Sequence, residues 1–191
     1  MNGEFDWLKQ EFKKHGGVFE NIGLGYKDDR GYYCKSLKPD EDVTIYCPDD
    51  LLINIEDVAV CDGGLYLDNS DQYGERAEFL NRYLVFHFSR DMLDDILRLK
   101  NNVESLSETD RALLAKLNLP EGHGSYSDEL SFIKKRIEHS HCIESKDSGN
   151  RLIMPFLSFL NHDKTGVPFK KGNENYGSGF CFTGRFDGEA F

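Results

Sequence analysis

Residues 151–163, with the sequence RLIMPFLSFLNHD, form an apolar run that ends abruptly at Asn161 and His162. The run is too short for a transmembrane helix, which needs about 20 apolar residues, and is typical of a buried strand or core backbone. The two hydrogen-bonding side chains at its end need partners, because a buried polar group without one costs about 1–3 kcal/mol. The partner is either the backbone of a turn, where asparagine is common, or a ligand.

The composition is that of a globular chain able to bury a core. Of the 191 residues, 39% are hydrophobic and 13% are aromatic. This length fits one domain, or one domain with an inserted subdomain. The formal net charge of −11 argues against nucleic-acid binding, which depends on lysine and arginine neutralising phosphates. An acidic surface favours a basic protein partner instead.

The cysteine pattern indicates reduced thiols inside a cell. The five cysteines are far apart and include no Cys-x-x-Cys pair: Cys34, Cys47, Cys61, Cys142 and Cys181. Residues 1–7 lack the basic and apolar regions of a signal peptide. We therefore predict a cytoplasmic protein that is not inserted in a membrane.

Patterns in the first part of the chain predict a helix followed by strands. Apolar residues at helical spacing predict a helix over residues 5–12, which a glycine pair ends. Residues 18–24 predict short strands joined by tight turns. Two further β-rich arms, residues 32–37 and 43–47, flank a polar turn that contains proline, so we predict a hairpin there.

Residues 75–141 have helical periodicity instead. Ser107 and Asp110 resemble a capping box, which predicts that a helix begins there. The expected class is α+β, organised as a β-rich half with a leading helix over residues 1–74, a helical insert over 75–141, and a closing segment over 142–191.

Two segments resemble parts of SET-domain protein methyltransferases, specifically the class that methylates the large subunit of Rubisco and carries an inserted helical region. Four residues match its segment with a leucine, a proline and an Asn-His pair: Leu152, Pro155, Asn161 and His162. Ser158 stands where the family has aspartate. Residues 30–53 are similar to the opening hairpin of the family, from its Arg-Gly to its Leu-Leu-Ile. The resemblance implies a SET-like β-rich fold with an inserted helical subdomain.

The resemblance also implies a function. The class transfers a methyl group from S-adenosylmethionine to protein lysine, with protein histidine as the alternative acceptor, which implies this cofactor and a protein substrate with an exposed basic side chain. The implied cofactor-binding residues are Arg30, Gly31, Tyr32, Ser140, His141, Ser158, Asn161 and His162. The alternative is a noncatalytic SET-like protein-binding module with a degraded cofactor pocket, which the replacement of family residues by Ser158 and His141 favours.

The catalytic tyrosine of this class lies in a Tyr-Gly motif after the Asn-His pair. Tyr176 is the candidate within this sequence, although it stands in a polar stretch typical of a loop. Residues 185–191 resemble the segment just before the family motif, so the tyrosine is alternatively expected beyond Phe191. In that case residues 1–191 alone are expected to be inactive and poorly stable.

No metal site is predicted. His139, His141 and Cys142 have side chains of the kind that bind zinc, but no second cluster completes a tetrahedral set. A nucleophilic Cys142 would need a lowered thiol pKa. We therefore expect Cys142 to be a buried structural thiol.

Overall fold

The computed structural model confirms the predicted α+β class, with helices and antiparallel sheets. It describes residues 2–27, 31–116, 128–145, 148–160, 169–185 and 189–190. The chain forms two compact units, here named the terminal unit (residues 1–53 and 153–191) and the central unit (residues 54–152). Among the described residues, no helix has both the length and the apolar character needed to cross a bilayer.

The terminal unit begins with the predicted helix, which is confirmed as α1. Its apolar face forms because Phe5, Leu8 and Phe12 recur at helical spacing and are buried. The chain reverses at Gly16, whose φ of 86° is accessible to glycine without strain. The elements of this unit are α1 (Asn2–Lys14), β1 (Val18–Glu20), β2 (Ile22–Lys27), β3 (Gly31–Ser36), β4 (Val43–Pro48), η1 (Asp49–Leu51), η5 (Leu157–Phe159), β10 (Lys170–Asn173), β11 (Gly177–Gly184) and β12 (Glu189–Ala190).

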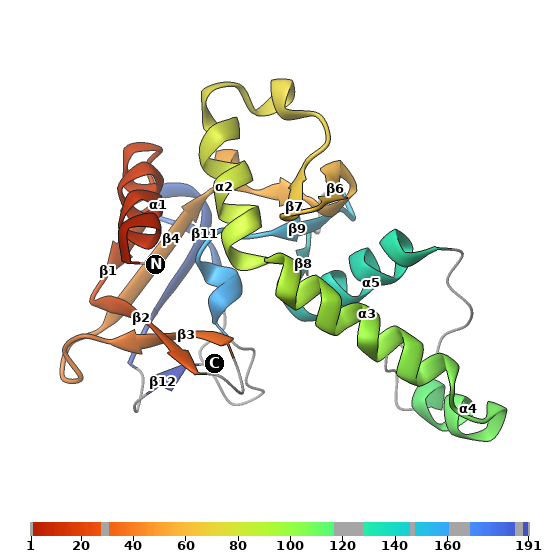
Figure 1. The fold of residues 1–191 in the computed structure, drawn as a ribbon. Helices are drawn as coiled ribbons and strands as arrows, with labels where there is room; N and C mark the ends of the chain where they lie inside the picture. Colours follow the sequence, from red (N-terminus) through yellow and green to blue (C-terminus); the bar gives the residue numbers. More distant parts are fainter. Residues whose placement is uncertain are drawn as a thin grey trace. The chain divides into compact units, whose positions relative to one another are not determined.

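Strands from both ends of the sequence share the sheets of the terminal unit (Figure 1). One sheet has the order β1-β4-β11-β10, in which β4 and β11 pair antiparallel from Val43 opposite Gly184 to Pro48 opposite Gly179. The other has the order β12-β3-β2, in which Ala190 lies opposite Cys34. This unit is therefore held together by pairings between segments that are distant in sequence.

The predicted hairpin of residues 32–37 and 43–47 is wrong in its pairing. Both arms are strands, β3 and β4, but they belong to different sheets. The turn between them is bound instead to Asn21, which lies between β1 and β2 with a φ of 57°. The backbone N–H of Leu37 donates to the Asn21 carbonyl at 3.1 Å. The chain therefore passes from one sheet to the other at this corner.

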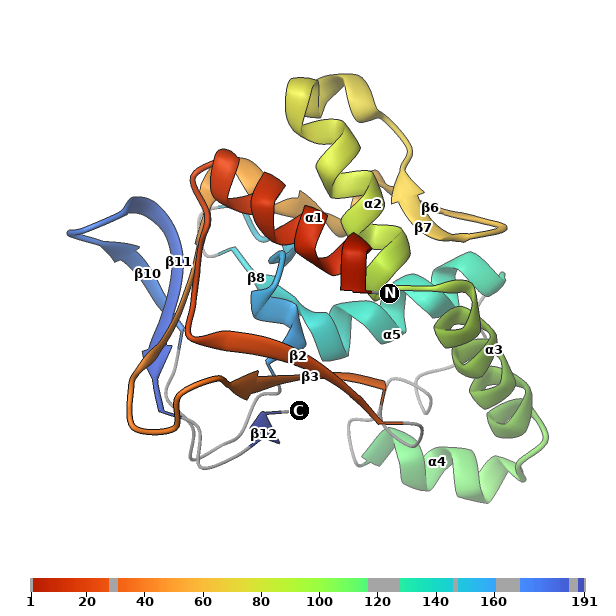
Figure 2. The same cartoon turned by 60° about the vertical axis from the view of Figure 1, so that its left-hand side comes forward.

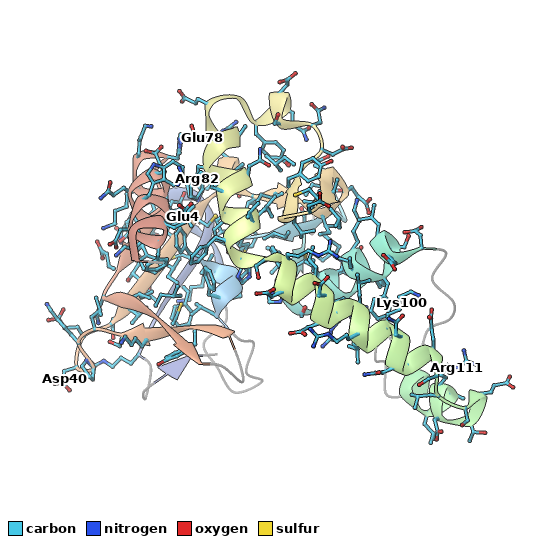
Figure 3. The ribbon with its side chains drawn as sticks, viewed as in Figure 1. Glu4, Asp40, Glu78, Arg82, Lys100 and Arg111 are labelled. Carbon is cyan, nitrogen blue, oxygen red and sulfur yellow. The ribbon has the colours of Figure 1, made fainter. Side chains whose placement is uncertain are left out.

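The side chain of Asn21 holds the corner through several hydrogen bonds. Its Nδ2 donates to the Lys38 carbonyl at 2.9 Å, the Glu41 carbonyl at 3.0 Å and Ser36 Oγ at 3.1 Å. Its Oδ1 accepts from the Lys38 N–H at 2.8 Å. Asp40 lies at the outer tip of the same turn (Figure 3). The side-chain amide of Asn21 thus holds this turn in place, as the hydrogen bonds between paired strands hold the turn of a hairpin.

Asn21→Asp is expected to lower the free energy of unfolding by about 2 kcal/mol, because two or three bonds of about 0.5–1.5 kcal/mol each are lost. The substitution keeps the shape but turns a donor into an oxygen that faces carbonyl oxygens. Urea unfolding followed by the fluorescence of Trp7, on α1, measures the effect. The matched control is Asn69→Asp, since the exposed Asn69 side chain makes no capping bond at η3. Equal stability of the two variants would contradict this role for Asn21.

The central unit contains the helices α2 to α5, which fall within residues 75–141. Its elements are η2 (Ile55–Asp57), β6 (Val58–Cys61), β7 (Gly64–Leu67), η3 (Ser70–Arg76), α2 (Ala77–His87), α3 (Arg90–Glu104), α4 (Glu108–Lys116), α5 (Glu129–His141) and β8 (Cys142–Glu144). The chain passes between the units in β5 (Ile53–Asn54) and β9 (Arg151–Ile153), which belong to a sheet of order β5-β9-β8.

Local capping signals place two of these helices. The predicted capping box before α4 is confirmed, because Ser107 Oγ accepts from the Asp110 N–H at 3.2 Å and donates to the Asp110 carboxylate at 2.7 Å. Asp128 caps α5 by accepting from the Ser131 N–H at 2.7 Å. Each side chain satisfies a backbone donor that the first helical turn leaves open.

The core of the central unit lies where α2 covers β7 and where α3 runs beside α5 (Figure 2). Its fully buried side chains include Leu65, Phe79, Leu80, Tyr83, Leu84, Phe88, Leu93 and Ile137. The outer face of α2 carries charged residues at helical spacing, such as Glu78 and Arg82, whose charged atoms are 3.8 Å apart (Figure 3). An exposed pair of this kind contributes little to stability.

Candidate functional site

The stretch that ends in Asn161 and His162 is core backbone, as its composition predicts. Residues 153–160 are all buried. After β9 the chain folds into η5, where the Ser158 N–H donates to the Met154 carbonyl at 2.9 Å and the Leu160 N–H to the Leu157 carbonyl at 3.0 Å. Ser158, the residue in place of the family's aspartate, is only 8% exposed. The chain is therefore compact up to the residue before Asn161.

Phe156 supports this stretch from inside an aromatic cluster. Its ring centroid lies 4.7 Å from that of Phe12, 4.8 Å from Phe19 and 6.0 Å from Phe5. Its backbone has φ 63° and ψ −35°, a conformation that residues with a Cβ rarely adopt. Such strain costs about 1–3 kcal/mol and persists only where the surroundings impose it, which is common near binding sites.

Three sequence-predicted site residues, Gly31, Tyr32 and Ser158, belong to β3 and η5 of the terminal unit. The helix η5, which contains Ser158, lies against β3 and β4. Gly31 and Tyr32 begin β3, opposite Lys27 and Tyr26 of β2. The closing strand β12 pairs with the far end of β3. Arg30, Asn161 and His162 fall outside the described residues.

Tyr176 lies in the turn between β10 and β11 and is 38% exposed. Its ring stacks on that of Tyr46, with centroids 5.1 Å apart and planes inclined by 26°. The Tyr46 hydroxyl donates to the Ser178 carbonyl. Desolvation, and then the nearby Asp49, raise the pKa of Tyr46, so this phenol stays protonated. In this arrangement Tyr176 is a surface residue of a hairpin supported by a second tyrosine.

Ser140 and His141 belong to the central unit, at the end of α5. Ser140 Oγ donates to the Arg136 carbonyl at 2.8 Å, so this hydroxyl is bonded within its own helix. The His141 ring lies edge-on to His87 at 5.1 Å and to Phe88 at 5.2 Å. Both side chains thus have contacts inside the central unit.

Cys142 is half-buried and not fully buried as expected, but it has the character of a structural thiol. Burial, and then the Glu138 carboxylate, raise its pKa to about 12, so the thiol is protonated at neutral pH. A protonated thiol is neither a good nucleophile nor a metal ligand. Within the described part of the chain, no group of three or more histidine, cysteine, aspartate or glutamate residues is arranged to hold a metal ion.

Sequence reasoning missed three features of this region: the backbone conformation of Phe156, the Tyr46–Tyr176 stack, and the corner at Asn21. Only the corner at Asn21 could have been suspected from the sequence, because asparagine is one of the few residues with a Cβ that is found at positive φ. The other two depend on residues distant in sequence.

Comparison of this chain with protein-family models found no match, and comparison with curated proteins found none either.

Proposed function

We propose that this chain is an S-adenosylmethionine-dependent protein N-methyltransferase that acts on lysine. In this proposal the terminal unit is a SET-like β-rich fold and the central unit contains its helical insert. The five free cysteines support a location in the reducing cytoplasm.

The observation that supports the proposal most directly is the convergence of the segments that carry the resemblance. The helix η5, two residues before Asn161, lies against β3 and β4, which come from the segment similar to the opening hairpin. The strand β12, from the segment similar to the one before the family's tyrosine, pairs with β3. Three segments that are far apart in sequence therefore meet in one unit.

For methyl transfer, the main task of the protein is to position the two reactants. Methyl transfer to an amine is an in-line displacement at the sulfonium methyl group, so most of the rate comes from aligning a neutral amine with that carbon. Burial of the lysine favours its neutral form. The net charge of −11 attracts a basic substrate segment. In this proposal Gly31, Tyr32 and the η5 stretch border the cofactor.

The second candidate function is a noncatalytic SET-like module that binds protein. The position of Tyr176 favours it, because an exposed tyrosine in a hairpin turn, stacked on Tyr46, is not enclosed as a catalytic phenol should be. The serine at position 158 favours it as well, because a neutral hydroxyl replaces the family's carboxylate.

Titration calorimetry of the chain with S-adenosylmethionine tests the first proposal. Binding is expected in the wild type, and Asn161→Ala or His162→Ala is expected to weaken it by about tenfold or more, the equivalent of one buried hydrogen bond. Asn69→Ala is the matched control and is expected to bind as the wild type does. The absence of any heat at millimolar cofactor, with the chain folded and extended past Phe191, would contradict the proposed cofactor site and favour the binding module.

A further inference from the structure

Two histidine rings pack against each other at the ends of two helices in the central unit. His87 is the last residue of α2 and His141 is the last residue of α5. Their ring centroids lie 5.1 Å apart with the planes at 90°. Phe88 touches both rings, at 4.3 Å from His87 and 5.2 Å from His141. The imidazoles and the phenyl ring therefore form one three-ring cluster between α2 and α5.

This cluster lies at a junction of the backbone. Phe88 ends α2 with φ −110° and ψ 62°, and α3 begins two residues later. The Phe88 carbonyl accepts from the Leu65 N–H of β7 at 3.3 Å. A Cβ at Gly64 would collide with that carbonyl, so the two backbones are in direct contact. A displacement of the rings would therefore disturb the packing of α2, α3, β7 and α5, which meet at this junction.

The surroundings of the cluster disfavour a positive charge on His87. Its Nε2 is buried, and the Tyr83 ring lies 5.6 Å away on the same helix. Desolvation, and then the nearby His141, hold the pKa of His87 well below its ordinary value of 6.5. Of the titratable groups that the structure describes, His141 is the one whose charge acts on His87. The nearby ends of the elements at the junction also carry titratable or charged side chains: Tyr66 on β7, Tyr83 on α2, Arg90, Asp91 and Asp94 on α3, Glu138 and His139 on α5, Cys142 and Glu144 on β8, and Arg151 on β9.

The charged residues around the junction are engaged in pairs of their own. Arg90 pairs with Asp94 at 2.9 Å, and Arg151 pairs with Glu144 at 3.0 Å. Glu138 pairs with Lys135 at 2.9 Å. Each of these carboxylates thus has a lysine or arginine partner, and the charge of Glu138 also acts on Cys142.

We propose that His87 and His141 form an acid-sensitive latch that holds the end of α5 against the joint between α2 and α3 at neutral pH and releases it in mild acid. A proton on His87 is disfavoured while the two rings are in contact, because the ring is buried there and the nearby His141 acts on its charge. The latch acts on the segment that continues from α5 into β8 and does not depend on the proposed methyltransferase activity.

The direction of the pH dependence follows from the number of protons that the closed and open forms bind. The closed latch keeps the pKa of His87 below 6.5, whereas in the open form His87 regains the ordinary value, so the open form binds more protons. Stability of the closed form is therefore lost as the pH falls below 6.5. For one such histidine the opening equilibrium rises by about tenfold from pH 7.5 to 5.5.

Hydrogen exchange measured by mass spectrometry on the full chain tests the latch. After correction for intrinsic exchange rates, protection of α2 and the last half of α5 is expected to fall by about tenfold between pH 7.5 and 5.5, with α1 as the internal reference. His87→Phe keeps an aromatic ring but cannot take a proton, so its protection should not change with pH. His139→Phe, at an exposed position on α5, is the matched control and should keep the response.

A second measurement covers the case in which His87→Phe does not fold. Histidine ring signals of the wild type in NMR are expected to show that His87 in the closed form is still neutral at pH 6.5, where an ordinary histidine is half protonated. A His87 ring that titrates at or above pH 6.5 without loss of protection would overturn the latch. So would a folded His87→Phe variant that still opens tenfold in acid.

Discussion

Phe156→Ala is expected to lower the free energy of unfolding by about 3–5 kcal/mol, the range for removing a buried phenylalanine ring and leaving a cavity. The Phe156 side chain is fully buried, and its ring contacts those of Phe12 and Phe19. Chemical denaturation followed by Trp7 fluorescence reports the loss, since Trp7 lies on the helix that carries Phe12. Loss of the Phe156 ring is also expected to disturb the candidate site, because Ser158 follows two residues later.

Phe156→Gly separates the loss of the ring from the strain of the backbone. Glycine ordinarily costs about 0.5–1 kcal/mol relative to alanine. At a φ of 63°, glycine removes steric strain of about 1–2 kcal/mol that alanine retains. The glycine variant should therefore be the more stable of the two. The reverse order at this position would show that the backbone of Phe156 is not strained.

Phe12 provides the matched pair for this comparison. It is as buried as Phe156 but lies inside α1, where glycine is about 1 kcal/mol less favourable than alanine. Phe12→Ala is therefore expected to be more stable than Phe12→Gly. The order of the two substitutions should invert between the two sites.

Gly179→Ala is the second large expected loss, of about 3 kcal/mol or more. Gly179 has a φ of 143°, and an added Cβ would meet the Cys47 carbonyl, with Pro48 Cα and the Tyr46 ring at 2.9 Å. Backbone strain of about 1–3 kcal/mol and overpacking of a similar size then add. Because β4 and β11 come from opposite ends of the sequence, the substitution acts on the pairing that joins them.

Gly172→Ala is the control for Gly179→Ala. Gly172 also has a positive φ, 75°, but a Cβ there meets no atom within 4 Å. It lies at a bulge of β10, where the register shifts between Lys171 and Asn173. In this variant the free energy of unfolding should fall only by the cost of alanine at a positive φ, about 1–2 kcal/mol. Thermal unfolding of both variants distinguishes the clash from the effect of φ alone.

The candidate site was predictable only in part. The apolar run of residues 151–160 indicated core backbone, and the structure buries it from residue 153 onward. The polar stretch of residues 170–179 indicated a loop, but only residues 174–176, which include Tyr176, form a turn, because the residues on either side pair as β10 and β11. By contrast, the pairing of residues 32–37 with 43–47 was wrong, because the Asn21 side chain binds the intervening turn and the strands enter different sheets.

The sequence by itself determined the elements whose signals act within about one turn of the chain. Ser107 and Asp128 cap helices by bonding to N–H groups three residues later, and Gly16 ends α1 at a φ of 86°. These bonds close over a few residues and cost little chain entropy, so residue type alone decides them.

Only the tertiary structure decided which strands pair and which backbones are strained. Ala190 lies opposite Cys34, and Tyr176 stacks on Tyr46, across most of the sequence. Phe156 has its positive φ where its ring packs against rings from α1 and β1. Such arrangements form because the summed burial of many side chains outweighs the local preference of one residue, and that sum is a property of the folded unit and not of any short segment.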